Sequence, residues 1–301
     1  MLGVEPQVRM ALQSSRPLDL FSTLAPVELG HALRIDRADA WRATRTPEGP
    51  ATIHLRIGDG TIAVEAWGPG AEWASQRAGA LCGEDDDARD FRPQHRLIAD
   101  LHRRNPGLRL ARTHAVFEAL VPAVLGQKVT TIEAKAGYRA LVDALGEPAP
   151  GPMRLKMAPS PQVLARTPYW AFHRFGIERR RAEVIIRAAR SAKRLEEITT
   201  MDLPSAYRRL GAFPGVGPWT AAKVALIALG DADAVPVGDY HLPHAVGYAL
   251  EGTPRSSDDR MLELLEPYRG QRARVIRLLT ISGIAAPRFG PHMPLRDIVN
   301  N

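Results

Sequence analysis

The chain has 301 residues, of which 45% are hydrophobic and 24% charged, and its net charge is +7. This is an ordinary globular composition for one large or two modest domains, and no apolar run reaches the roughly 18 residues of a membrane helix. The only cysteine, Cys82, excludes an intrachain disulfide, a four-cysteine iron–sulfur cluster and a cysteine-rich zinc site. Because the first residues lack the apolar core of a signal peptide, we expect a cytoplasmic protein.

The first third of the chain has the pattern of a small antiparallel sheet. Residues 1–16 are expected to form a flexible tail. Apolar residues then alternate with polar ones over 53–57 and 62–66, and Gly58-Asp59-Gly60 between them indicates a hairpin. A third strand over 41–45 and a helix over 71–81 complete this part. The acidic run Glu84-Asp85-Asp86-Asp87 that follows is expected to be an exposed loop.

From about residue 110 the apolar period becomes helical. The sequence therefore predicts an α+β, mostly α fold. Residues 17–108 form a sheet and helix domain, and residues 109–301 form a helical domain with a hairpin at 210–221. The expected helices cover 115–125, 130–145, 179–193, 204–210, 218–229, 241–250, 257–265 and 271–281.

Charge is distributed unevenly along the chain. The first hundred residues hold 11 basic and 15 acidic residues, a net charge of −4, whereas the remainder holds 29 basic and 18 acidic residues, a net charge of +11. A basic helical domain suits a surface that binds phosphate, although an arginine-rich solvated surface would have the same composition.

Residues 210–221 read Leu-Gly-Ala-Phe-Pro-Gly-Val-Gly-Pro-Trp-Thr-Ala and combine a glycine-rich turn with a helix start. Gly215 and Gly217 lack Cβ, so the backbone there can adopt a positive φ and approach a ligand closely. Pro218 suits the first helical turn, where its missing N–H costs nothing. The free N–H groups of such a turn form an anion site, for which phosphate is the natural ligand. Asp239, about twenty residues on, is then a carboxylate held near bound phosphate.

The hairpin and three further segments resemble, in order and spacing, motifs of the helix-hairpin-helix superfamily of DNA glycosylases. The other segments are Asn105-Pro106-Gly107 running on to Gly126-Gln127, then residues 175–183, and then Val235-Pro236-Val237-Gly238-Asp239. The bacterial 3-methyladenine DNA glycosylase II branch is the most similar. The resemblance covers roughly residues 105–285, and four motifs in order are far more specific than one glycine-rich turn.

The resemblance implies that Asp239 is the catalytic carboxylate. Cleavage of an N-glycosidic bond builds positive charge on the sugar, which a fixed carboxylate stabilises while it orients or deprotonates the attacking water. An Asp in this position is also a common helix cap. Trp219 stands where bifunctional relatives have a Schiff-base lysine, so the resemblance implies a monofunctional enzyme. A tryptophan face also suits stacking on an electron-poor alkylated base, whereas core packing is its alternative role.

The resemblance also implies how DNA and a cation are bound. DNA-binding residues are Gly215, Gly217 and Thr220 of the hairpin together with Gln127 and Lys128. A monovalent cation, Na⁺ or K⁺, is expected at backbone carbonyls of the hairpin, and neither another cofactor nor an iron–sulfur cluster is expected. By register, these carbonyls are those of Gly211, Phe213 and Val216.

Two lysines depart from the branch. Lys223, one turn after Trp219, replaces an aromatic pocket residue; it can pair with Asp239, repel cationic bases, or extend to solvent or a phosphate. Lys128 replaces the apolar wedge that fills the gap left by a flipped nucleotide. Both departures concern the range of lesions more than the class of reaction.

Other aromatic and histidine residues are weaker candidates. Tyr240 and Tyr268 are predicted for the wall of the base pocket, with core packing equally compatible for each. His241 and His244 have a metal-like spacing on one helix without a third ligand, which favours a surface or supporting role.

The leading hypothesis is a monofunctional DNA glycosylase that flips alkylated purines out of duplex DNA. The alternatives are a glycosylase for deaminated or oxidised bases and a catalytically weak DNA-binding protein that keeps the hairpin. We expect double-stranded DNA with a damaged base as partner, no membrane association, a monomer, and a cytoplasmic, nucleoid-associated protein.

Overall fold

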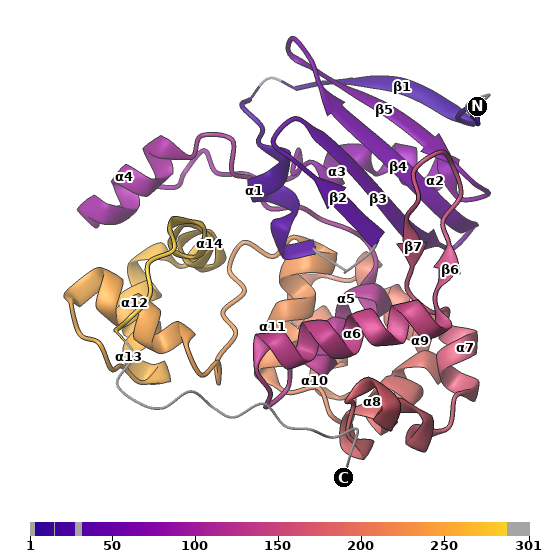
Figure 1. The fold of residues 1–301 in the computed structure, drawn as a ribbon. Coiled ribbons are helices and arrows are strands. Elements are labelled where there is room, and N and C mark those ends of the chain that lie inside the picture. The colour runs from indigo at the N-terminus through magenta and orange to yellow at the C-terminus, as the bar shows by residue number, and fades with distance from the viewer. Residues whose placement is uncertain (1–3, 15, 28–31, 288–301) are drawn as a thin grey trace.

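The computed structural model describes residues 4–14, 16–27 and 32–287. Figure 1 shows three parts, which are an antiparallel sheet at the top, a central group of helices below it, and a second group of helices at the left. Helices predominate and the sheet is small, so the predicted α+β, mostly α fold class is confirmed. Within the described residues, no helix is long and apolar enough to cross a membrane.

The sheet has five antiparallel strands in the order β1-β5-β4-β3-β2. The predicted hairpin is confirmed, because β4 and β5 pair with Leu55 opposite Val64 and both side chains are buried. This one-sided burial explains the alternation of apolar and polar residues in both strands. The strands are β1 (Val8–Gln13), β2 (Leu33–Ile35), β3 (Asp39–Thr46), β4 (Gly49–Ile57) and β5 (Thr61–Trp67).

Short helices accompany the sheet. The predicted third strand is β3, and the predicted helix over 71–81 is divided at Arg77 into two pieces. Leu81 and Cys82, at the end of the second piece, are buried with the apolar residues of the sheet. The helices of this part are α1 (Leu20–Leu24), η1 (Ala25–Val27), α2 (Ala71–Gln76) and α3 (Ala78–Leu81).

The N-terminal segment differs from the expected flexible tail. Residues Val8–Gln13 form β1, an edge strand whose Met10 lies opposite Val64 of β5. Most β1 side chains are exposed, so the strand lacks the alternation by which a half-buried strand is recognised. Backbone hydrogen bonds to the open edge of β5 hold it in place. The tail prediction is therefore wrong for β1, and residues 1–3 and 15 lie outside the described chain.

The central group of helices surrounds α5 (Val116–Leu125), in which eight of ten side chains are buried. The helices predicted between residues 115 and 229 are present, although 179–193 and 218–229 are each divided near their ends. The remaining elements of this group are α6 (Thr131–Leu145), β6 (Glu147–Pro148), β7 (Lys156–Met157), α7 (Pro161–Arg166), η3 (Tyr169–Phe175), α8 (Arg179–Arg190), α9 (Ala192–Glu196), η4 (Glu197–Thr200), α10 (Leu203–Gly211), α11 (Pro218–Val224) and η5 (Ala225–Leu229).

The third part joins α4, from the first third of the chain, to the C-terminal helices. Ile98 and Leu101 of α4 share a hydrophobic core with Val275 and Leu278 of α14. The expected boundary at residue 108 is therefore wrong, because α4 packs with the C-terminal helices rather than with the sheet (Figure 1). We call this part the C-terminal lobe. Its elements are α4 (Arg96–Arg104), α12 (Leu242–Glu251), α13 (Asp258–Leu265), η6 (Glu266–Tyr268) and α14 (Arg272–Ser282).

Buried ion pairs connect the three parts. Arg42 of β3 donates to Glu118 of α5 at 2.5 Å, which ties the sheet to the central helices. Asp86 pairs with Arg274 of α14 and also accepts a hydrogen bond from the Leu110 N–H at 2.9 Å. Asp86 is only 8% exposed, so the prediction that the acidic run is an exposed loop is wrong for this residue. These charges are buried because each has its hydrogen-bonding partner.

Candidate functional site

The hairpin between α10 and α11 depends on a glycine at position 215. Gly215 has φ +95°, and a Cβ added there would lie 2.4 Å from Cγ2 of Val184 on α8. Both the left-handed backbone and the close packing therefore exclude other residues. The loop is further held by a hydrogen bond of 3.1 Å from the Arg187 guanidinium to the Pro214 carbonyl.

Gly217 has a different role from the one expected of it. Its φ is −92°, so the expectation of a positive φ is wrong at this position, and a Cβ there would meet no atom within 4 Å. Gly217 is exposed and directly precedes Pro218, the first residue of α11. The absence of a side chain leaves the backbone before the helix open to an approaching ligand.

The side chains of Gln127 and Thr220 stabilise the hairpin loop by hydrogen bonds. The Gln127 amide donates to the Gly215 carbonyl and to the Thr220 hydroxyl, both at 2.9 Å. Thr220 is 2% exposed, so its side chain stabilises the loop and does not face solvent. Lys128, the residue after Gln127, is exposed and has φ +56°, a conformation that is unusual for a lysine. Of these three residues, Lys128 is the most exposed and Gln127 is half-buried.

The carboxylate of Asp239 lies where the chain passes from the central helices to the C-terminal lobe. Its Oδ1 accepts hydrogen bonds from the N–H groups of His241 and Leu242, at 2.9 and 3.0 Å, and so caps the start of α12. Its Oδ2 accepts a bond of 2.8 Å from Nε1–H of Trp219. The loop before it is fixed by Gly238, whose N–H donates to the carboxylate of Asp258. Three donors therefore set the orientation of this carboxylate.

Trp219 and Lys223 stand on one face of α11 beside Asp239. The Trp219 ring packs so closely on Gly126 that a Cβ there would lie 3.1 Å from Cη2. The Lys223 ammonium lies 6.0 Å from the centroid of the Trp219 ring. The pKa of Lys223 is lowered, mainly by burial. The Asp239 carboxylate opposes this shift, and Arg277 adds to it. The structure thus brings together three of the predicted site residues, Asp239, Trp219 and Lys223.

The two predicted tyrosines lie elsewhere. Tyr268 is buried in the core of the C-terminal lobe, where its hydroxyl accepts a hydrogen bond from the His95 N–H at 3.1 Å. Tyr268 therefore has the core-packing role that was its alternative in the sequence analysis. Tyr240 is 74% exposed, and its ring has edge contacts with His241 and His244. No cluster of three or more His, Cys, Asp or Glu side chains able to hold a metal occurs among the described residues.

One buried charged residue near this group was not singled out in the sequence. Arg277 of α14 is 8% exposed, donates to the Ser22 carbonyl at 2.9 Å, and is close enough to lower the pKa of Lys223. Burial lowers its own pKa to about 10. The only signal in the sequence is that Arg274 and Arg277 interrupt an otherwise apolar helix face.

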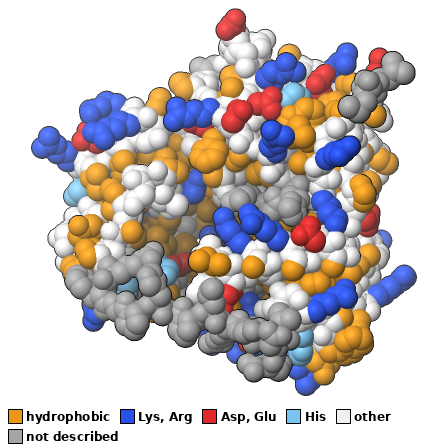
Figure 2. Space-filling model, in the orientation of Figure 1, with side chains coloured by type: hydrophobic (Ala, Val, Ile, Leu, Met, Phe, Trp, Pro, Cys, Tyr) orange, Lys and Arg blue, Asp and Glu red, His pale blue; other side chains and the backbone are white. Residues whose placement is uncertain are grey.

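A cleft separates the C-terminal lobe from the central helices. Figure 2 shows the surface hollowed between the lobe at the left and the centre of the molecule, with hydrophobic side chains on its walls. The segment with Asp239 connects these two parts. A planar apolar group could enter the cleft while a polar backbone stays outside.

The predicted cation ligands lie at the last residue of α10 and in the loop that follows it. The Phe213 carbonyl accepts a hydrogen bond from the Val216 N–H at 3.0 Å, which leaves it one further lone pair. Gly211 is the exposed last residue of α10. Carbonyl oxygens are suitable ligands for a hard cation.

Comparison with known proteins finds sequence relatives, whereas no family model matches the chain. The chain is 35% identical to DNA-3-methyladenine glycosylase 2 of Escherichia coli over 125 residues, which is 40% of this chain and 44% of that protein. It is 26% identical to the DNA-3-methyladenine glycosylase of Bacillus subtilis over 168 residues, 54% of this chain and 55% of that protein. The matches thus span about half the length of these relatives.

Solved structures resemble the chain over almost its whole length. The 3-methyladenine DNA glycosylase of Archaeoglobus fulgidus has a TM-score of 0.74 at 19% identity and covers 91% of this chain and 98% of its own. The 8-oxoguanine glycosylase/lyase of Clostridium acetobutylicum, solved with double-stranded DNA, has a TM-score of 0.67 at 14% identity. The match covers 93% of this chain and 98% of that one. The sheet and both groups of helices therefore form one known fold.

Proposed function

Since the chain is a relative of the 3-methyladenine DNA glycosylases and has the fold of the helix-hairpin-helix superfamily, we propose that it is a monofunctional DNA glycosylase. On this proposal it acts as a monomer on the nucleoid DNA of the cytoplasm and removes alkylated purines from duplex DNA in base excision repair. The observation that carries the proposal is the carboxylate of Asp239, which three donors orient beside Trp219.

The chemistry follows from the charge of the transition state. When the bond between C1′ of the sugar and the base nitrogen breaks, its electron pair leaves with the base and the sugar becomes positively charged. At about 4 Å and an effective dielectric of about 20, one carboxylate stabilises this charge by about 4 kcal/mol, or about three decades of rate. Water then attacks C1′ and gives its proton to Asp239 or to solvent. The products are a free base and an abasic site.

The hairpin supplies the proposed DNA contact. Backbone N–H groups near Gly215 and Gly217 would bind phosphate without reading the base sequence. The exposed Lys128 would occupy the gap left by the flipped nucleotide with its stem and reach a phosphate with its ammonium. The carbonyls of Gly211, Phe213 and Val216 would hold a monovalent cation that neutralises part of the phosphate charge. None of the catalytic steps depends on that cation.

Asp239→Asn tests the proposed catalytic residue. We expect release of free 3-methyladenine from methylated DNA to fall by about three decades, since the charge is lost while the shape is kept. Binding to DNA with an abasic-site analogue should persist or tighten. Asp259→Asn, the same change at an exposed residue of α13, is the matched control and should retain full activity. Wild-type base release by Asp239→Asn would refute the assignment.

The product of the reaction tests the monofunctional class. The amine of Lys223 lies near the site, so a covalent intermediate must be examined directly. We expect intact strands with abasic sites and no enzyme–DNA adduct after borohydride treatment. A trapped adduct that disappears in Lys223→Met would instead make this lysine a nucleophile. A panel of alkylated, deaminated and oxidised bases would determine the class of lesion.

A further inference from the structure

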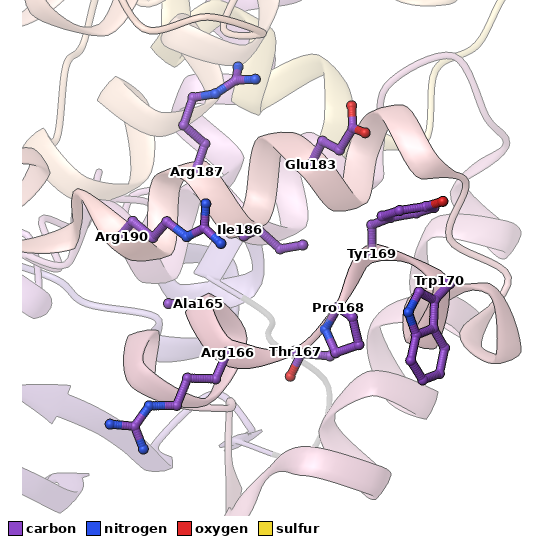
Figure 3. Close-up of a pocket in the computed structure, with 10 residues that line it drawn as sticks. All are labelled: Ala165, Arg166, Thr167, Pro168, Tyr169, Trp170, Glu183, Ile186, Arg187 and Arg190. Atoms are coloured by element: carbon purple, nitrogen blue, oxygen red, sulfur yellow. The ribbon is translucent and has the colours of Figure 1, made fainter.

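A basic and aromatic hollow of about 500 Å³ lies between α7 and α8, next to the part of α8 that contacts the hairpin. Figure 3 shows Arg187 and Arg190 on α8, Arg166 across from them at the end of α7, and Tyr169 and Trp170 at the other end. We call this the α7–α8 hollow. None of these five residues belongs to the site of Asp239.

The hollow carries an excess of positive charge. Its one acidic residue, Glu183, is paired with Arg179 at 2.6 Å, so this carboxylate is already neutralised. Arg166 and Arg190 are both exposed, and neither has a carboxylate within ion-pair distance among the described residues. Unpaired arginines that line one hollow favour an anionic ligand, and their planar, forked donors match phosphate.

The aromatic end of the hollow has a solvent-exposed ring, that of Trp170. Trp170 is 64% exposed, which is unusual for so large an apolar side chain. Tyr169 lies beneath the guanidinium of Arg179, 4.7 Å from its ring centroid, and so is already covered. The ring of Trp170 is therefore available to stack on another planar group, and a nucleobase next to its own phosphate satisfies both ends of the hollow.

The hollow is continuous with the hairpin through one helix. Val184 of α8 packs on Gly215, and Arg187 donates to the Pro214 carbonyl, while Arg187 also lines the hollow. Arg190 lies about one helical turn beyond Arg187, the residue that contacts both the hairpin and the hollow. A strand bound at the hairpin would thus lie next to the hollow.

We propose that the α7–α8 hollow is a second DNA site that binds an unpaired strand next to the duplex on the hairpin. This inference rests on the proposed function. Arg166 and Arg190 bind phosphates, and Trp170 stacks on a base. Single-stranded DNA fits better than duplex because the bases of a duplex are already stacked on one another and cannot cover Trp170. A single-stranded segment of this kind adjoins the duplex at a nick, a gap or a frayed end.

The test compares two DNA probes that share one duplex with an abasic-site analogue. One probe is blunt, and the other carries a single-stranded extension of about eight nucleotides, within the site size of known single-strand grooves. We expect the extension to tighten binding by about tenfold in the wild type, the effect of stacking about one base. Trp170→Ala and Arg190→Ala should lose this gain and keep their affinity for the blunt probe. Both residues are exposed, so the variants should fold.

Arg56→Ala, an exposed arginine of β4 without an ion pair among the described residues, is the control and should keep the gain. An extension without effect on the wild type would overturn the proposal, as would a gain that survives both substitutions. A gain equally large for an added duplex arm would also overturn it, because it would show phosphate contacts without stacking. Failure to bind even the blunt probe would instead refute the proposed function itself, and this inference with it.

Discussion

The charge of Lys223 should determine which damaged bases the protein accepts. Its ammonium lies 6.0 Å from the centroid of the Trp219 ring. A base stacked on that ring, with the two ring centroids about 5 Å apart at right angles to this direction, would lie about 8 Å from the ammonium. At an effective dielectric of about 20, two positive charges at that distance repel each other by about 2 kcal/mol, or about 30-fold in rate. A cationic N-alkylated purine feels this repulsion, whereas a neutral lesion does not.

Lys223→Met removes the charge and keeps the length of the side chain. The assay measures kcat/KM for release of 3-methyladenine, which is cationic in DNA, and of hypoxanthine, which is neutral. We expect the ratio of the two values to shift about 30-fold toward the cationic base in the variant. Lys193→Met, the same change at an exposed lysine of α9, should leave the ratio unchanged. Loss of the Lys223 charge also removes its interaction with Asp239, which alters both rates alike. Only the ratio of the two rates therefore isolates the repulsion between Lys223 and a cationic base.

The pH dependence provides a second readout of the same charge. Burial lowers the pKa of Lys223, so the amine loses its proton at a lower pH than an ordinary lysine. As the pH rises through that pKa, the repulsion disappears and the wild-type ratio should move toward the cationic base. The Met variant should show no such change. A ratio that is equal in wild type and Lys223→Met at every pH would refute the reasoning and place the ammonium outside the field of the bound base.

Other substitutions test the hairpin and the stability of the fold. Gly215→Ala should weaken binding to all DNA sequences alike and lower the Tm, because of the positive φ and the 2.4 Å approach to Val184, whereas Gly217→Ala, with open space, should leave the Tm unchanged. Burial, with help from Arg112, lowers the pKa of His114 to about 4, so only the unfolded chain binds a proton as the pH falls from about 6.5 toward 4. Stability to urea should therefore decrease over that range, and less so in His114→Asn, since asparagine tolerates the φ of +52°. A decrease of equal size in the variant would show that other groups cause it.

Local sequence patterns were sufficient where local forces determine the structure. The hairpin of β4 and β5 alternates because one face is buried, and the main helices show an apolar face for the same reason. The glycine-rich turn was also predictable, since Gly215 occupies a backbone conformation that other residues avoid. Such features depend on neighbours only a few residues away.

Features that depend on distant partners could not be predicted in this way. The strand β1 exists because β5 offers it an open edge, and α4 joins the C-terminal lobe because its apolar side fits α14. Asp86 looked like one member of a solvated acidic run, yet Arg274, far along the chain, pairs with it in the interior. In each case the deciding partner lies far along the chain, where no periodicity indicates it.

The hydrogen bonds of Asp239 make its structural role compatible with the catalytic role proposed for it. At the level of sequence, Asp239 as a helix cap and Asp239 as a catalytic carboxylate are alternatives. In the structure the capping bonds use only Oδ1, while Oδ2 accepts from Trp219, so the capping role does not exclude the proposed catalytic one. Capping fixes the carboxylate at the start of α12 in the C-terminal lobe, and Trp219 belongs to α11 of the central helices, so their hydrogen bond joins these two parts. A carboxylate oriented in this way needs little reorganisation when charge develops nearby, which is the condition for electrostatic catalysis.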